Sequence, residues 1–493
     1  MTTTTALVAG EDRMLIDGKL VRTASGATFD VIHPGTGEVA GVATDGTIDD
    51  MSAAIAAARR AFDETDWSTN HEFRRRCLLQ LRDALVEEKE HLRRVITSEV
   101  GSPIMLADSI QLEWPINELA HWAEYATSFK YEKDLGIVDS IGAQSHAMQY
   151  YEPIGVVGAI TAWNVPLYLN IATVGPALAA GNTVVLKPAQ FTPWCGSELG
   201  RLVAEKTDIP AGVFNVVVSN SNDVPAALSA DPRVDMITFV GSTATGRKIL
   251  AAAAPTVKRV CLELGGKSAN IFLDDADFNT FLPMAGGMIC GHAGQGCTYN
   301  SRILVPRSRY DEAVAILKAT MEAIPFGDPW DPQFFMGPLS SQMQLDKVLG
   351  LIDRAVKDGA KLIVGGKRAE GFTGYFVEPT LLIDVDPMSE IAQEEIFGPV
   401  ITLIAFEDDD DAVRISNSTI YGLCGEVTSG SVERALKVAK RIRTGTMSIN
   451  GAPYFSMAAP LGGYRQSGLG RRYSEEGFVE YLEIKTVGLP VGS

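Results

Sequence analysis

Cys297 lies in the segment HAGQGCTYN, residues 292–300, where glycines and polar residues surround it. Gly294 and Gly296 leave room around the thiol, and a nucleophilic cysteine needs access for its substrate and backbone N–H donors nearby. Cys261 lies instead in the apolar run RVCLEL, so we expect it to be a buried structural residue, as most free cysteines are. Cys297 is therefore the candidate nucleophile.

Two other side chains could complete a site for carbonyl chemistry. Glu263 stands between two leucines and just before Gly265 and Gly266. We interpret its surroundings as apolar, and burial among apolar groups makes a carboxylate a stronger base. A structural cap or ion pair is the alternative. Asn164, in TAWNVP, is a side-chain amide in an apolar stretch and could donate a hydrogen bond to an oxyanion.

The segment FVGSTATGRKIL, residues 239–250, has the pattern of a strand, a glycine turn and the start of a helix. Gly241 and Ser242 would bring backbone and hydroxyl donors to the helix N-terminus, which suits a pyrophosphate. The segment matches neither GxGxxG nor the P-loop, and an ordinary strand-to-helix turn fits it equally well. Lys187, in VLKPAQ, would point toward a cofactor's ribose and phosphates, although a solvated lysine at a strand end is the simpler explanation.

Residues 153–186 contain no charged side chain, which raises the question of a membrane-spanning helix. Pro166 and Pro176 interrupt the stretch, and Gly181-Asn182 resembles a turn. We therefore predict a buried strand, an apolar helix and a second buried strand, because strands covered on both faces read as continuous apolar runs.

The first 130 residues are predicted to be mainly helical. Residues 52–64 and 75–101 repeat apolar side chains at intervals of three and four, with polar residues between them. Asp49 and Asp50 place negative charge where the first helix begins, and Gly101 ends the second.

Short β-branched runs then alternate with stretches of helical pattern. The first set predicts a parallel sheet with strands at residues 156–160, 182–188, 213–218 and 236–241. Such a sheet is of the nucleotide-binding type, and its ligands bind at the carboxyl ends of the strands. A second set predicts another α/β domain, with strands at 302–306, 362–366, 400–406 and 446–450 and helices at 310–324 and 411–418.

The composition excludes several classes of partner. A formal net charge of -18 argues against nucleic acid and anionic membranes, because both need a basic surface. The six cysteines form no CxxC motif and no zinc-ligand spacing, so we expect no metal site and a reducing, cytoplasmic location. The first residues, MTTTTALVAGEDR, do not resemble a signal peptide.

The motifs follow one another in an order that resembles the aldehyde dehydrogenase superfamily over nearly the whole chain. They are ITAWNVPL, VVLKPAQFTP, FVGSTATG, LELGGKS, GQGC, EEIFGPV and PLGGYRQSGLGR, with Glu263 preceding Cys297 by 34 positions. The resemblance implies an α/β protein with a Rossmann-like NAD(P)-binding domain (1–131 and 153–264), a catalytic α/β domain (265–478) and a small β oligomerisation arm (132–152 and 479–493). Such proteins form dimers or tetramers.

The resemblance also implies roles for individual residues. Cys297 would attack an aldehyde, Asn164 and the Cys297 N–H would hold the oxyanion, and Glu263 would activate the water that hydrolyses the thioester. The cofactor, NAD or else NADP, would contact Trp163, Lys187, Gln190, Gly241, Ser242, Glu395 and Phe397. Residues that match the family's substrate tunnel are Val165, Tyr168, Leu169, Ala172, Thr298, Phe455 and Leu461.

Three positions depart from the family pattern. Gln190 stands where an acid often binds the ribose hydroxyls, and a neutral amide does not repel a 2′-phosphate, so use of NADP stays open. Thr173 and Arg472 stand where many members carry lysine and glutamate, two groups thought to relay protons. We hypothesise that the relay is absent and that Glu263 carries deacylation alone.

The predicted tunnel is apolar and lacks lysine and arginine, which favours a medium to large hydrophobic aldehyde, whether aliphatic, aromatic or terpenoid, over a carboxylated semialdehyde. Two alternatives remain. An acylating dehydrogenase would pass the thioester to coenzyme A, but such members often lack the base that Glu263 would be. A non-catalytic, nucleotide-binding scaffold protein would not need Cys297, Asn164 and Glu263 together.

Overall fold

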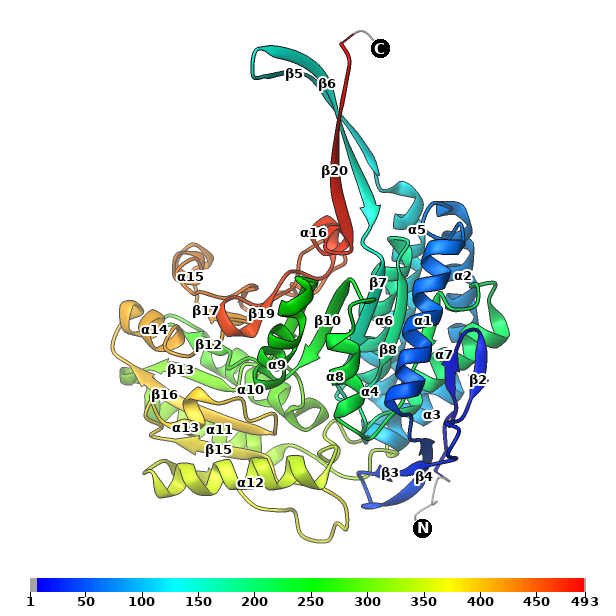
Figure 1. Cartoon of the computed structure of the whole chain (residues 1–493). Coiled ribbons are helices and arrows are strands. Elements are labelled where there is room, and N and C mark those ends of the chain that lie inside the picture. The colour runs from blue at the N-terminus through cyan, green and yellow to red at the C-terminus, as the bar shows by residue number, and fades with distance from the viewer. Residues whose placement is uncertain (1–6, 492–493) are drawn as a thin grey trace.

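The computed structural model describes residues 7–491, so residues 1–6 of the predicted cofactor-binding domain and 492–493 of the predicted arm lie outside it. Figure 1 shows two sheets flanked by helices and a long β arm that projects from the body. Two separate hydrophobic cores lie around the two sheets. The α/β fold class is therefore as predicted.

The beginning of the chain differs from the helical prediction. It starts with four strands, β1 (Met14–Ile16), β2 (Lys19–Val21), β3 (Thr28–His33) and β4 (Glu38–Thr44). Helices follow: α1 (Ile48–Glu64), α2 (His71–Glu87), α3 (Lys89–Val100), α4 (Ile104–Asp108), a π-helical turn (Ser109–Glu113) and α5 (Trp114–Ser128). A capping box between Thr47 and Asp50 starts α1, and Gly101 ends α3 in the left-handed conformation with φ 70°.

The first sheet has eight strands in the order β19-β11-β10-β7-β8-β9-β1-β2. Its parallel centre is β7 (Val156–Ile160), β8 (Thr183–Lys187), β9 (Phe214–Val216), β10 (Met236–Gly241) and β11 (Arg259–Leu264). Helices α6 (Pro166–Ala179), α7 (Trp194–Lys206), α8 (Asp223–Ala230) and α9 (Thr243–Ala253) connect these strands. The uncharged stretch forms β7, α6 and β8 as predicted, and every residue of these three elements is buried.

The second sheet has seven strands in the order β14-β15-β16-β13-β12-β17-β18. They are β12 (Ala269–Phe272), β13 (Arg302–Pro306), β14 (Lys361–Val364), β15 (Thr380–Ile383), β16 (Val400–Phe406), β17 (Gly425–Thr428) and β18 (Ser448–Ile449). Its helices are α10 (Phe278–Cys290), α11 (Tyr310–Ala323), α12 (Gln342–Lys357), α13 (Glu390–Gln393), α14 (Asp409–Ser416) and α15 (Val432–Ala439).

The last part of the chain returns to the first sheet. β19 (Gly468–Leu469) pairs with β11 so that Gly468 lies opposite Glu263, and α16 (Ser474–Val479) follows. The exact domain boundaries remain a prediction.

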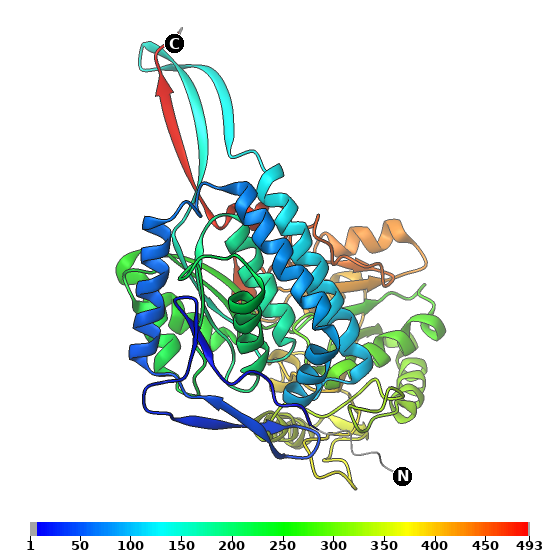
Figure 2. The same cartoon turned by 90° about the vertical axis from the view of Figure 1, so that its right-hand side faces the viewer.

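The arm is a three-stranded antiparallel sheet in the order β20-β6-β5. Its strands are β5 (Glu132–Ser140), β6 (Ala143–Pro153) and β20 (Leu482–Leu489), which lie in the two segments predicted for an arm except that β6 extends to Pro153. Figures 1 and 2 show that these strands extend well beyond the rest of the molecule. No helix within residues 7–491 is both long and apolar enough to span a bilayer.

Candidate active site

A cavity of about 590 Å³ lies between the two cores and is lined by residues of both. The three candidate catalytic residues, Cys297, Glu263 and Asn164, all line it. Cys297 and Asn164 are contributed by loops, and Glu263 by the end of β11. The carboxyl ends of parallel strands and the loops beyond them are where open α/β sheets bind ligands.

Cys297 is half-buried, whereas the other five cysteines are buried. The chain turns sharply after α10, with positive φ at His292 (47°), Ala293 (52°) and Gly294 (75°). A Cβ on Gly294 would lie 2.1 Å from the Gly398 carbonyl oxygen, so this turn requires glycine. Burial, followed by the nearby carboxylates of Glu263 and Glu395, raises the pKa of the Cys297 thiol well above its ordinary value.

Glu263 faces the thiol with one oxygen, because Oε1 lies 3.9 Å from the Cys297 sulfur. The expectation of apolar surroundings for this carboxylate is wrong. Its other oxygen, Oε2, lies 2.8 Å from the guanidinium Nε of Arg472, which is itself buried. The ion pair that sequence reasoning kept as an alternative is therefore present.

Asn164 is buried in the cavity wall, where its Nδ2 donates to the Gln295 carbonyl at 2.9 Å. An amide nitrogen carries two hydrogens, so one N–H remains for another acceptor. The Asn164 backbone carbonyl accepts a hydrogen bond from His292 Nε2 at 2.7 Å. Burial lowers the pKa of His292 to about 4, so this ring is neutral. His292 was not singled out in the sequence, although it lies in the same HAGQGC motif as the thiol.

Five of the residues predicted to bind the cofactor line the cavity: Trp163, Gly241, Ser242, Glu395 and Phe397. The rings of Trp163 and Phe397 meet edge to face with centroids 5.3 Å apart. Ser242 caps α9 by accepting a hydrogen bond from the Thr245 N–H. The Glu395 carboxylate accepts one from the Gly266 N–H at 3.0 Å.

Lys187 and Gln190 lie outside the cavity lining. Lys187 is not a solvated lysine, because it is 3% exposed and its Nζ donates to the carbonyls of Pro188 and Ser219. Burial lowers its pKa to about 8, and Asp45 opposes that shift. Gln190 is half-buried just beyond the end of β8.

Of the predicted tunnel residues, Val165, Tyr168, Leu169, Thr298 and Phe455 line the cavity. Ala172 and Leu461 are buried and do not line it. Sequence reasoning missed a further group of lining residues, because they lie in segments without a recognisable motif: Leu106, Ile110, Gln111, Met288, Phe335 and Tyr454.

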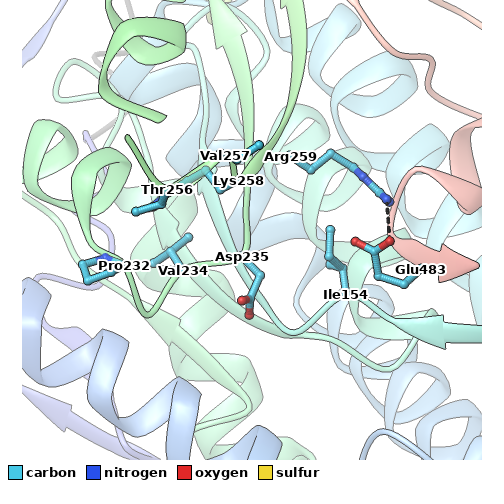
Figure 3. Close-up of a pocket in the computed structure, with 9 residues that line it drawn as sticks. All are labelled: Ile154, Pro232, Val234, Asp235, Thr256, Val257, Lys258, Arg259 and Glu483. Atoms are coloured by element: carbon cyan, nitrogen blue, oxygen red, sulfur yellow. Dashed lines mark hydrogen bonds and ion pairs between the residues drawn. The ribbon is translucent and has the colours of Figure 1, made fainter. Parts of the chain in front are cut away.

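A second cavity, of about 400 Å³, lies where β10 and β11 begin, close to the base of the arm (Figure 3). Arg259 and Glu483 form an ion pair across it at 3.0 Å, which joins β11 to β20. It lies at the amino ends of the parallel strands, away from the thiol. Within residues 7–491, no cluster of three His, Cys, Asp or Glu side chains could hold a metal ion.

Comparisons with known proteins show the family to which this chain belongs. The profile of the Aldehyde dehydrogenase family matches residues 20–487. A 3-succinoylsemialdehyde-pyridine dehydrogenase from Pseudomonas sp is 42% identical over 475 residues, which cover 96% of this chain and 97% of that protein.

Solved structures share the fold of this chain. A mutant of aldehyde dehydrogenase C from Pseudomonas syringae, in complex with NAD+ and octanal, has a TM-score of 0.91 and 38% identity, covering 97% of this chain and 96% of that one. The Mycobacterium tuberculosis aldehyde dehydrogenase in complex with NAD+ has a TM-score of 0.93 and 39% identity, and the match covers 98% of this chain and 99% of that one. A betaine aldehyde dehydrogenase from Staphylococcus aureus in complex with NAD+ has a TM-score of 0.94 and 35% identity, and the match covers 99% of this chain and 96% of that one. This chain belongs to the aldehyde dehydrogenase family.

Proposed function

We propose that the protein oxidises a hydrophobic aldehyde to its carboxylic acid with NAD, through a thioester on Cys297. The observation that carries the proposal is the convergence of Cys297, Glu263 and Asn164 on one cavity, with the Glu263 carboxylate 3.9 Å from the sulfur. A nucleophile, a base and an oxyanion donor within one site are the groups that acyl-transfer chemistry needs.

In the first step, the Cys297 thiol loses its proton to water, the thiolate sulfur bonds to the aldehyde carbon, and the carbonyl oxygen becomes an oxyanion. The free N–H of Asn164 Nδ2 and the Cys297 backbone N–H donate to that oxygen. Asn164 is held in place by its hydrogen bond to Gln295 and by the contact of its carbonyl with His292. The donor is therefore oriented before the charge develops.

The residues present fit a dinucleotide. The cavity reaches from the N-terminus of α9, at Gly241 and Ser242, to the thiol, and Trp163 and Phe397 form an aromatic wall. Glu395 offers a carboxylate to ribose hydroxyls, and Lys187 at the end of β8 and Gln190 just beyond it lie at the adenosine side. When bound, NAD accepts hydride from the substrate carbon. Gln190 carries no charge that would repel NADP, so NAD is the first choice and NADP a second.

The thioester is then hydrolysed. Glu263 takes a proton from water, the water oxygen bonds to the acyl carbon, and the carbon–sulfur bond breaks to release the acid and the Cys297 thiolate. Glu263 Oε1 lies 3.9 Å from the sulfur, so this one carboxylate can serve the step.

The proposed substrate class rests on the apolar side chains of the cavity, which include Val165, Leu169, Met288 and Phe455. The cation that lines the cavity, Lys347, interacts with Glu394 and Glu395 on the cofactor side. The complex of the Pseudomonas syringae enzyme with octanal supports an aliphatic aldehyde. The name of the Pseudomonas sp relative supports a substrate that carries an aromatic ring.

The arm supports self-association into a dimer or tetramer. Leu135, Ile137 and Ile484 are apolar and 42%, 53% and 56% exposed on its strands. Apolar side chains exposed on a projecting sheet mark a protein contact. Light scattering on the purified protein measures its oligomeric state.

The six cysteines are free thiols, which suits the reducing environment of the cytoplasm. Fractionation of cells tests this proposed location.

The proposal is tested with a panel of aliphatic, aromatic, terpenoid and carboxylated aldehydes, each with NAD and with NADP. We expect NADH formation and the highest kcat/KM for uncharged hydrophobic aldehydes. The highest kcat/KM for a carboxylated semialdehyde would overturn the substrate class. Formation of acyl-CoA on addition of coenzyme A would make the protein an acylating enzyme, and no reaction with any aldehyde would contradict the proposed activity.

A further inference from the structure

Arg472 lies against the oxygen of Glu263 that faces away from the thiol. Its Nε is 2.8 Å from Oε2, and the two side chains are only 5% and 8% exposed. The other oxygen, Oε1, is the one beside the Cys297 sulfur. One oxygen of the carboxylate is thus occupied by a guanidinium while the other is turned toward the nucleophile.

Both residues are also fixed through their backbones. Arg472 exchanges backbone hydrogen bonds of 2.7 and 2.8 Å with Leu461. Glu263 pairs with Gly468 at the edge of the first sheet. Because both backbones are held by neighbouring chain segments, the ion pair fixes the direction of the Glu263 side chain.

Helix α6 holds the other side of the guanidinium. Arg472 Nη2 donates to Thr173 Oγ1 at 3.0 Å, and this hydroxyl donates to the Leu169 carbonyl at 2.7 Å. Within the described part of the chain, Nε and Nη1 have no hydrogen-bond partner, so Nε meets Glu263 Oε2 as an ion pair without hydrogen-bond geometry. The guanidinium therefore acts on Glu263 and Thr173, and removing one member of a buried pair leaves the other charge uncompensated.

A second buried carboxyl group, Glu118, does not compete for Arg472 by direct contact. Glu118 accepts hydrogen bonds from Trp122 Nε1 at 3.2 Å and from Tyr473 Oη at 3.4 Å. The direct carboxylate partner of Arg472 is therefore Glu263.

We propose that Arg472 is a positioning residue for deacylation, an inference that rests on the proposed function. By holding Oε2, it keeps Oε1 beside the acyl group on the sulfur, where Oε1 accepts the proton of the attacking water. The water oxygen bonds to the thioester carbon, the proton passes to Oε1, the carbon–sulfur bond breaks, and the sulfur leaves as thiolate. Acylation of the sulfur does not require Oε1 to accept a proton from water.

The test uses p-nitrophenyl acetate without any cofactor, so that it does not depend on aldehyde oxidation. The initial burst of nitrophenolate reports acylation of Cys297, and the slow phase reports hydrolysis of the acetyl-enzyme. Arg472→Gln is expected to keep the burst and to slow the second phase about tenfold or more, with acetylated Cys297 accumulating in the intact mass. Arg472→Lys keeps the charge, so we expect its slow phase to be faster than that of Arg472→Gln. Thr173→Val should slow the same phase by less than Arg472→Gln does.

Arg471→Gln is the matched control, because this neighbouring arginine contacts backbone carbonyls of Gly463 and Gly470 instead of Glu263. A double-mutant cycle with Glu263→Gln adds a readout that a merely structural role would not give. If Arg472 acts through Glu263, Arg472→Gln has little further effect on deacylation in the Glu263→Gln background.

Equal losses in both phases for Arg472→Gln, additive losses in the cycle, or the same slowing by Arg471→Gln would each overturn the role of Arg472. If Arg472→Gln does not fold, Arg472→Lys and Thr173→Val carry the same test, and unchanged slow phases in both would overturn it. A wild-type protein that hydrolyses the ester but produces no NADH from any aldehyde would contradict the proposed function alone.

Discussion

The Cys297 sulfur and the Glu263 Oε1 oxygen lie 3.9 Å apart, although one belongs to the loop after α10 and the other to β11 of the first sheet. The two cores thus contribute one reactive group each. A separation of this size is long for a strong hydrogen bond, and it leaves the carboxylate beside whatever acyl group the sulfur carries. A base in that place acts on a water molecule that approaches the thioester.

Glu263→Gln should separate the two halves of the reaction. The amide has nearly the same shape as the carboxylate but cannot take a proton from water, so the first NADH per active site still forms while steady-state turnover falls about 10²- to 10⁴-fold. Stopped-flow absorbance measures both rates. Glu483→Gln, on the arm, is the control. Turnover of Glu263→Gln close to the wild-type value would show that another group deprotonates the water.

The pH dependence of thiol alkylation follows from the surroundings of Cys297. Burial and the carboxylates of Glu263 and Glu395 raise the pKa of this thiol, so the reactive thiolate becomes more populated as the pH increases. The rate of alkylation by iodoacetamide, followed by intact mass, should rise beyond pH 9.0 without a plateau, because 9.0 is the ordinary pKa of the group. Glu263→Gln removes a negative neighbour and moves the profile to lower pH. A plateau near neutral pH in the wild type would contradict this account.

Asn164→Ala removes one of the two proposed oxyanion donors. Because this donor acts mainly when charge develops on the oxygen, kcat should fall about 10²- to 10³-fold, or about 3 kcal/mol, while KM changes little. Steady-state kinetics measure the effect. Asn417→Ala, which removes an amide that does not line the cavity, is the comparison. A change in KM alone would assign Asn164 to substrate binding instead.

Gln190→Glu should increase the preference for NAD over NADP. A carboxylate here would repel a 2′-phosphate, whereas the natural amide does not. The ratio of kcat/KM for NAD to that for NADP is expected to rise about tenfold or more, which corresponds to about 1.4 kcal/mol. Gln190→Met keeps the size of the side chain without adding a charge, so it should change kcat/KM for NAD and for NADP by the same factor. An unchanged ratio in Gln190→Glu would place the 2′ position elsewhere.

Much of the fold could be predicted from the sequence because its central strands are buried on both faces. The predicted strand bounds are close to the observed ones in the uncharged run of residues 153–186 and in the runs at 302–306 and 400–406. The strands before residue 45 were missed. β1 and β2 have only three residues each, which is too short for an alternating pattern to be recognised.

The surroundings of Glu263 could not be predicted from its neighbours. Successive side chains of a strand point to opposite faces of the sheet, so Leu262 and Leu264 say little about what Glu263 faces. Its true neighbour, Arg472, is more than 200 positions away in the sequence, and the pairing of β11 with β19 helps to bring the two segments together. Motif order named the candidate reacting residues, but the contact between one of them and Arg472 depends on the fold.

His292 should make the stability of the protein depend on pH in the acid range. Its pKa is lowered by burial from 6.5 to about 4, so the unfolded chain binds this proton more readily than the folded protein does. The folded state is therefore not penalised above pH 6.5, and it loses up to about 3 kcal/mol of stability relative to the unfolded state as the pH falls from 6.5 to about 4. Urea titrations at several pH values, for the wild type and for His292→Gln, give the free energy of unfolding. The difference between the two proteins should shrink as the pH falls, because glutamine does not titrate. A difference that stays constant would mean that His292 does not become charged on unfolding in this range, and that its contact with the Asn164 carbonyl is insensitive to acid.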